Sequence, residues 1–314
     1  MNRLFLSLMV ICALVCLIAL AGAVAVGAAA QTDQIAFDSA RSGNTDIFLL
    51  DAGRSMLARL TLGDTLDFSP AWSPSGQQLA YISLSPQRLE SSLIVMNWDG
   101  SQRRAIASVH LNGIVNSALA WSPDGSQIAY TTSDGSGTQG VYLVDLEGSE
   151  PYRVTESRGN VFSPTWSPGG QLAFAWSPVA NTEIYVFSPQ LVEMLDSHTP
   201  DPAPQRITSS YYTDTAPAWS PDGEWIAFVS DRAGSSDVYL MRPDGNALHA
   251  LTDTSDLDTN PTWSPDSSRL AFVSNRDGAR TLYIMNADGS SVQRLLEAVS
   301  EDSRPAWRPG GPLS

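Results

Sequence analysis

"APAWSPDGEWIAFVSDRAGSSDVYLMRPDGNALHALT", residues 216–252, is one complete unit of a repeat that runs through the chain. Its first strand holds Trp219 and ends in Ser-Pro-Asp-Gly, which favours a hairpin turn because proline presets φ and glycine adopts the left-handed conformation. The segments "WIAFVS" and "DVYLM" alternate aromatic and aliphatic residues, as packed strands do. A second turn, "PDG", precedes a last strand ending in "ALT". The unit predicts four short antiparallel strands.

A tryptophan followed by Ser-Pro or Arg-Pro marks the same position in six repeats, at intervals of 44 to 53 residues. Four-strand units repeated at about 40–50 residues are typical of β-propeller blades. A tryptophan at one position of every blade is more typical of packing between blades than of carbohydrate stacking. The six are Trp72, Trp121, Trp166, Trp219, Trp263 and Trp307.

The two ends of the repeat region complete one blade between them. Ahead of Trp72, "QIAFDSA", "DIFLLDAG" and "ARLT" supply second, third and fourth strands without a first, and "PAWRPGGPLS" at the other end supplies a first strand. Joining them removes open sheet edges, whereas an open β-solenoid leaves these strands without partners. We therefore expect an all-β, six-bladed propeller over residues 35–309, with a short linker at 31–34 and a C-terminal tail at 310–314.

The N-terminal segment predicts export. An apolar run from Leu4 to Ala30 follows Arg3 and thins into alanine and glycine, and Ala28 and Ala30 form an A-x-A site before Gln31. This order is typical of a secretory signal peptide, here residues 1–30. The run is also long enough for an uncleaved membrane anchor, since about 20 residues span a bilayer. Either alternative implies a periplasmic, extracellular or cell-surface location.

Charge and cysteine content narrow the function classes. The formal net charge is -15, and all 18 basic residues are arginine. Nucleic acids and anionic lipid surfaces are poor partners for such a chain, because neutralising phosphates needs clustered cations. Cys12 and Cys16 both lie in the apolar run. The rest of the chain has no disulfide, no cysteine-bound zinc and no cysteine nucleophile.

The repeat pattern, with "PAWSPDG", "IAF", "SDR", "DVYLM" and "LT" in order, resembles the repeats of the TolB-type β-propeller family over residues 35–309. The resemblance implies an exported interaction scaffold with a partner in the cell envelope. TolB itself carries an α/β domain ahead of the propeller. Repeat strands begin here at Ile35, so we expect no such domain in this chain.

The sequence shows few signs of catalysis. It has three histidines, His110, His198 and His249, and neither G-x-S-x-G, H-E-x-x-H nor a phosphate-binding loop. A triad needs a base beside its nucleophile, so serine hydrolysis is not favoured. We expect no enzyme activity and no cofactor, with calcium as the one candidate.

A polar residue stands five places before the tryptophan in five of the six repeats. Because the innermost strands of a propeller converge on its channel, we expect these short side chains to form a ring at the channel mouth. The loops "SARSG", "SDRAG" and "SNRDG" bring Arg41, Arg232 and Arg276 to the same side. The position is occupied by Asp67, Asn116, Val161, Asp214, Asp258 and Asp302, with Asn160 one place before Val161.

Two interpretations of this ring remain open. The aspartates either cap their own turns and pair with the loop arginines, or they form a ligand site, for example for Ca²⁺ at Asp214, Asp258 and Asp302. The first hypothesis for the whole protein is a monomeric, non-enzymatic scaffold that binds a protein, peptide or glycan at the channel mouth. The alternative is a calcium-dependent, lactonase-like propeller hydrolase.

Overall fold

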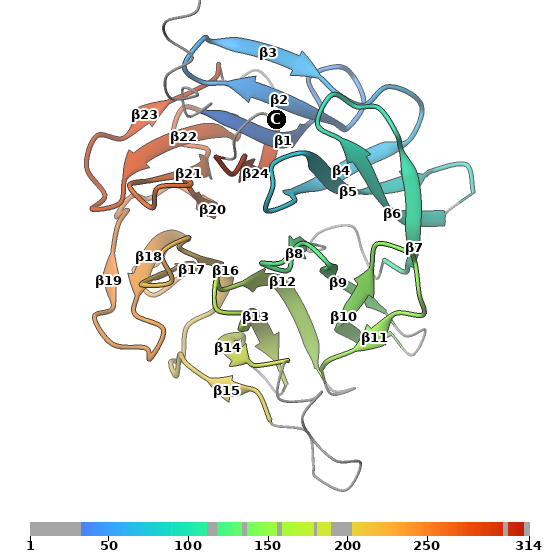
Figure 1. The fold of residues 1–314 in the computed structure, drawn as a ribbon. Coiled ribbons are helices and arrows are strands. Elements are labelled where there is room, and N and C mark those ends of the chain that lie inside the picture. The colour runs from blue at the N-terminus through green and yellow to red at the C-terminus, as the bar shows by residue number, and fades with distance from the viewer. Residues whose placement is uncertain are drawn as a thin grey trace, which may run out of the picture. The chain divides into compact units, whose positions relative to one another are not determined.

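The computed structural model describes residues 33–88, 90–111, 118–133, 137–155, 159–178, 181–189, 203–297 and 301–310. Within these residues 24 strands form six four-stranded antiparallel sheets, and no helix is present that could span a membrane. The sheets are arranged as the blades of a propeller (Figure 1). The predicted all-β, six-bladed fold is confirmed.

Each blade is named here by its place in the chain, and its innermost strand is given first. Blade 1 contains β24 (Asp302–Trp307), β1 (Gln34–Ser39), β2 (Asp46–Asp51) and β3 (Met56–Arg59). Blade 2 contains β4 (Leu66–Trp72), β5 (Gln78–Ser85), β6 (Glu90–Asn97) and β7 (Arg104–Val109). Blade 3 contains β8 (Leu119–Trp121), β9 (Gln127–Ser133), β10 (Gln139–Asp145) and β11 (Tyr152–Arg153).

The remaining three blades repeat the same order. Blade 4 contains β12 (Asn160–Trp166), β13 (Leu172–Ser177), β14 (Glu183–Phe187) and β15 (Gln205–Arg206). Blade 5 contains β16 (Asp214–Trp219), β17 (Ile226–Ser230), β18 (Asp237–Met241) and β19 (His249–Ala250). Blade 6 contains β20 (Asp258–Trp263), β21 (Arg269–Ser274), β22 (Thr281–Asn286) and β23 (Gln293–Arg294).

The two ends of the repeat region pair as predicted. Strand β24 lies antiparallel to β1, with Trp307 opposite Ile35 and Ala306 opposite Ala36. The last strand of the repeat region is therefore the innermost strand of blade 1. Because β24 pairs with β1, the inner edge of β1 is not left exposed, and blade 1 is complete between blades 6 and 2.

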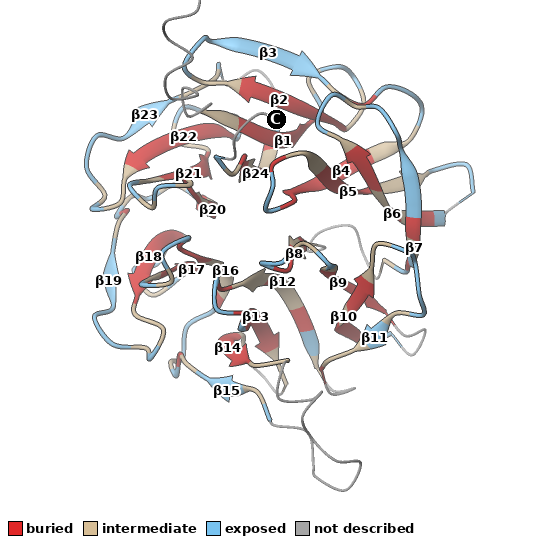
Figure 2. Ribbon diagram, in the orientation of Figure 1, coloured by how far each residue is buried: buried red, intermediate tan, exposed pale blue. Residues whose placement is uncertain are grey.

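The core lies between the blades, because each strand presents opposite faces to two neighbouring blades. In "IAF" of β17, Ile226 and Phe228 pack with residues of blade 4, whereas Ala227 packs with residues of blade 6. The alternation of large and small residues lets aromatic rings of one blade lie against alanines of the next. Figure 2 shows buried middle strands and exposed outer strands in blades 1, 4, 5 and 6.

Five of the six repeat tryptophans are buried, and Trp166 is partly exposed. Three of the six donate their indole N–H to a carbonyl oxygen of the preceding blade, at 3.0–3.1 Å. These bonds tie adjacent innermost strands together. The donors are Trp72, Trp121 and Trp263, and the acceptors are Ala306, Ala71 and Ala218.

A β-bulge interrupts the innermost strands of blades 1, 2, 4, 5 and 6 two to four residues before the tryptophan. Each of these bulges contains a proline, which is tolerated there because a bulge interrupts the ladder of hydrogen bonds to which proline cannot donate. The residue before the proline adopts a left-handed conformation with φ of 43–58°. These bulges line a central cavity of about 250 Å³. The left-handed residues are Ser69, Ser163, Ala216, Asn260 and Arg304.

Candidate functional site

Strand direction brings the predicted site residues to one end of the propeller. Each innermost strand begins at the end of its blade where the loop between the second and third strands emerges, because successive strands are antiparallel. The connection from the preceding blade enters at the same end. We call this end the channel-mouth face. It includes the loops 40–45, 231–236 and 275–280 and the connections 61–65, 207–213 and 253–257.

Three of the predicted aspartates each bind one of the predicted arginines. In each pair the guanidinium Nη2 lies 2.7–3.0 Å from both carboxylate oxygens, and Nε donates to a serine hydroxyl at 2.8–3.0 Å. The aspartate side chains have no exposed surface, while the arginine side chains are 14–22% exposed. The pairs are Asp302–Arg41, Asp214–Arg232 and Asp258–Arg276.

Aromatic rings and the neighbouring blade hold each pair in place. The Arg232 guanidinium lies 4.9 Å from the ring centre of Tyr239, and Arg276 lies 5.0 Å from that of Tyr283. The backbone N–H of Asp258 donates to the Ser236 carbonyl of blade 5 at 2.7 Å. Each aspartate at such a position therefore joins its own blade to the preceding one.

These three residues follow the first of the two interpretations, since each pairs with its loop arginine, and they do not form the ring that was expected around the channel. Their carboxylates are buried and neutralised by arginine, and they do not line the central cavity. The physical reason is that the bulge twists the innermost strand between this position and the cavity wall, so residues three to one places before the tryptophan face the cavity instead.

The other predicted ring positions differ from one another. Asp67 is buried and accepts a hydrogen bond from the Ser83 hydroxyl at 2.6 Å, and Asn116 lies outside the described residues. In blade 4 the sheet register places Val161 opposite Trp176, and Val161 takes the buried position. Asn160 is exposed at the start of the strand.

The structure does not bring Asp214, Asp258 and Asp302 together as a calcium site. They lie in three different blades, and each binds its own arginine. Within the described residues no three histidine, cysteine or acidic side chains are grouped so that they could hold a metal ion. The calcium prediction thus has no donor set at these positions.

A second row of buried acids was missed by sequence reasoning. Asp46, Glu183 and Asp237 open the third strands of blades 1, 4 and 5. Asp46 binds Arg59 at 2.7 Å, and Glu183 binds Arg206 and accepts the Thr208 hydroxyl. The signal was an acid before each of "IFLL", "IYVF" and "VYLM". These acids bind the loops of the channel-mouth face from the next strand outward.

One further buried acid lies beside the channel wall. Asp38 occupies the position that is Val229 in blade 5 and Val273 in blade 6, and it accepts the Ser69 backbone N–H at 3.1 Å. Burial raises the pKa of the Asp38 carboxyl, and the charge of Arg304 offsets part of that rise. The folded protein thus binds the Asp38 proton more tightly than the unfolded chain does.

This raised pKa predicts a defined pH dependence. Because folded Asp38 binds its proton more tightly than unfolded Asp38, lowering the pH from 7 towards the ordinary value of 3.8 should stabilise the wild type relative to Asp38→Asn. Urea unfolding of both proteins at several pH values measures this gap. Asp244→Asn is the control, since hydrogen bonds from Asn246 lower the pKa of Asp244 and the gap should move the other way. A gap that moves in the same direction for both variants would contradict the assignment.

Known β-propeller proteins resemble this chain in sequence and in structure. A family model described as "TolB beta propeller domain" matches residues 85–262. A protein named "Protein TolB homolog" from Chlorobium luteolum is 33% identical over 153 residues, which are 48% of this chain and 33% of that protein. The match thus spans about a third of the length of this curated relative.

Two solved structures share the architecture. TolB from Acinetobacter baumannii superposes with a TM-score of 0.73 and 22% identity, over 88% of this chain and 67% of the other. A putative TolB from Agrobacterium tumefaciens superposes with a TM-score of 0.64 and 21% identity, over 90% of this chain and 93% of the other. At such identities the likeness shows the propeller fold.

Proposed function

Because the chain belongs to the TolB β-propeller domain family, we propose that it is an exported scaffold that binds a protein of the cell envelope through its channel-mouth face. Export is supported by the apolar segment with its small-residue site before Gln31. The chain acts by binding and carries out no chemical step. The buried Asp–Arg pairs hold the loops that make up the binding face.

The observation that carries this proposal is a set of exposed apolar side chains on the connections that enter the innermost strands. Tyr211 is fully exposed, and Leu62 is 67% exposed. Tyrosine and other large apolar side chains supply most of the binding energy in protein interfaces. The set lies on the channel-mouth connections of blades 2, 5 and 6 and consists of Leu62, Tyr211, Tyr212 and Leu257.

Acidic residues lie on the same connections as these side chains and on an adjacent loop. Asp64, Asp253 and Asp256 lie on the same connections, and Asp231 lies on the adjacent loop of blade 5. The Asp231 carboxylate accepts the backbone N–H of Thr213 at 2.8 Å and so fixes the connection that carries the two tyrosines. A partner that fits this face combines apolar side chains with a basic rim, and charge complementarity speeds its association.

The proposal predicts that the double variant Tyr211→Ser, Tyr212→Ser loses partner binding. Truncating a hot-spot residue of an interface, a class in which tyrosine is enriched, costs about 2 kcal/mol or more, so affinity should fall at least about tenfold. The melting temperature should change little because both side chains are exposed. Tagged wild type and variant are compared by capture from envelope extracts, followed by affinity measurement with the captured protein.

The matched control is Leu248→Ser, Val292→Ser, which removes two exposed apolar side chains at the opposite ends of the strands. This control variant should bind the partner with the affinity of the wild type. If the tyrosine variant captures the same proteins with unchanged affinity, the channel-mouth face is not the binding face.

A further inference from the structure

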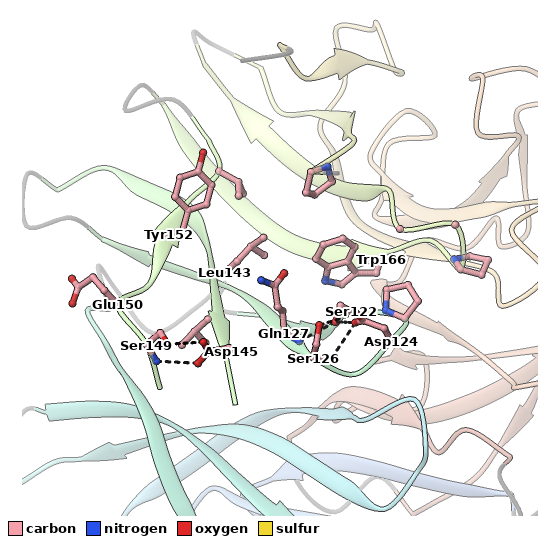
Figure 3. A pocket seen from close by; sticks show the side chains of 17 residues that line it. Ser122, Asp124, Ser126, Gln127, Leu143, Asp145, Ser149, Glu150, Tyr152 and Trp166 are labelled. Atoms are coloured by element: carbon pink, nitrogen blue, oxygen red, sulfur yellow. Dashed lines mark hydrogen bonds between the residues drawn. The ribbon is translucent and has the colours of Figure 1, made fainter. Parts of the chain in front are cut away.

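Blades 3 and 4 are separated by an open groove with a volume of about 630 Å³. It lies at the strand ends opposite the channel-mouth face, between the turns 122–127 and 145–152 of blade 3 and the turn 167–170 of blade 4. Figure 3 shows Leu143 and Gln127 between the rings of Tyr152 and Trp166. The volume lies in the range of small-ligand sites. We call it the 3/4 groove.

The groove exists because Trp166 is not covered as the other repeat tryptophans are. Trp166 is partly exposed, whereas Trp307 and Trp263 are 5% and 6% exposed. Its indole N–H makes no hydrogen bond, as is also true of Trp219 and Trp307, so the difference lies in the exposure of the ring. An aromatic face is thus left open at one blade boundary.

At the boundary between blades 6 and 1, an arginine of the chain covers the equivalent ring. The Arg269 guanidinium lies 5.0 Å from the ring centre of Trp307 and binds Asp33 of blade 1 at 2.6 Å. Arg269 pairs with Asn286 in its sheet, as Gln127 pairs with Asp145. Position 127 is thus the counterpart of position 269, and no arginine lines the groove beside Trp166. Glutamine alone does not uncover the ring, because Gln78 occupies the same position in blade 2 and Trp121 of the next blade is only 7% exposed.

The boundary between blades 1 and 2 uses the same arrangement with a different arginine. The Arg308 guanidinium lies 5.1 Å from the ring centre of Trp72 and 4.9 Å from that of Trp98, and it donates to the Gly76 carbonyl. Two boundaries of this propeller are therefore filled by a guanidinium stacked on the repeat tryptophan. Such contacts stabilise by roughly 0.5–2 kcal/mol.

The 3/4 groove is lined by negatively charged side chains, and none of its lining residues is positively charged. Its lining residues include Asp124, Asp145 and Glu150 and no arginine. The Ser122 hydroxyl lowers the pKa of Asp124, and the Ser149 hydroxyl lowers that of Asp145, so both are ionised at neutral pH. Figure 3 shows Asp124 on the Trp166 side of the groove, and Asp145 and Glu150 on the Tyr152 side.

We propose that the 3/4 groove binds an arginine side chain of a protein partner, which stacks on Trp166 as Arg269 stacks on Trp307. Asp124, on the Trp166 side, supplies the counter-charge beside the bound guanidinium, and Asp145 and Glu150 add negative charge on the Tyr152 side. Arginine fits better than lysine because its planar group stacks on an aromatic face and its hydrogen bonds are directional. This surface lies away from the channel-mouth face, so it is a second contact site, and its test is independent of the first.

The primary test uses the variant Gln127→Arg, which introduces at position 127 the arginine found at the equivalent position 269. A fluorescently labelled peptide, acetyl-Gly-Gly-Arg-Gly-Gly-amide, is titrated with wild type and variant by fluorescence anisotropy. The matched peptide carries citrulline, the neutral analogue of arginine. We expect the arginine peptide to bind the wild type at least tenfold more tightly than the citrulline peptide, and Gln127→Arg to abolish that preference.

Side-chain truncations locate the contact. Trp166→Leu should weaken arginine-peptide binding by about three- to thirtyfold, the range of a cation–π contact. Asp145→Asn with Glu150→Gln should weaken it and reduce its salt dependence. The control Asp288→Asn removes a carboxylate from the corresponding turn of blade 6, where Arg269 fills the groove, and should change nothing.

Three results would overturn the proposal. One is equal binding of arginine and citrulline peptides. Another is that the wild type and all variants bind the arginine peptide and a lysine peptide equally well. That result would show only a general attraction of positively charged peptides to an acidic protein. The third is unchanged arginine binding in a folded Gln127→Arg variant. Far-ultraviolet circular dichroism and melting curves establish that each variant is folded.

Discussion

Deleting residues 303–314 should abolish the stable monomeric fold. The deletion removes nearly all of β24, so β1 loses its antiparallel partner on the channel side, and the boundary between blades 6 and 1 loses Trp307. It also removes Arg308, which stacks between Trp72 and Trp98. Domains are stable by only about 5–15 kcal/mol, and the loss of a whole innermost strand exceeds such a margin. The exposed strand edge and apolar face should then cause aggregation.

Size-exclusion chromatography and thermal unfolding measure this outcome. The control removes only residues 311–314 and should retain the monomer and the melting temperature. A synthetic peptide of residues 301–314 should restore part of the stability when it is added during refolding, because β24 pairs with β1 across the ends of the repeat region. A truncated protein that remains monomeric with an unchanged melting temperature would refute closure through this blade.

Replacing Arg276 by methionine should lower the free energy of unfolding by about 3–5 kcal/mol. The substitution leaves the fully buried Asp258 carboxylate without the guanidinium that binds both of its oxygens. Breaking a buried ion pair from one side costs this much, because an uncompensated charge stays in the protein interior. Equilibrium urea unfolding gives the value.

The double variant Arg276→Met, Asp258→Asn separates the charge effect from lost packing. It removes both charges, so its unfolding free energy should recover to within about 1–2 kcal/mol of the wild type. Arg280→Met is the matched control, since Arg280 and Glu301 are more than half exposed and 3.7 Å apart, and it should change stability by less than about 1 kcal/mol. A double variant no more stable than Arg276→Met would show that packing, and not the buried charge, explains the loss.

The repeat pattern was sufficient to predict the architecture. Turn chemistry such as Ser-Pro-Asp-Gly and the alternation in "IAF" are local properties, and a four-strand unit repeated in sequence has few ways to bury both faces of each sheet. The incomplete units at Ile35 and Trp307 then specified closure. No long-range information beyond the repeat was needed.

The candidate site could be predicted only in part. The register of Asp214, Asp258 and Asp302 and their loop arginines was visible in the sequence. Their burial was not, because the bulge that redirects each strand depends on a left-handed residue such as Ala216 or Asn260, whose conformation the sequence pattern does not reveal. Counting five places back from the tryptophan therefore gave the correct residues and the wrong surface.

The sequence by itself determined the number of blades, the strand order and the split blade, since these follow from periodic patterning and turn residues. Tertiary structure decided which charges meet and which surfaces stay open. Arg269 and Gln127 occupy the same repeat position, yet only the packing of one blade against the next shows that Arg269 covers Trp307 while Trp166 stays partly exposed. The physical reason is that side-chain length and charge act across blade boundaries, between residues about 40 positions apart in the chain.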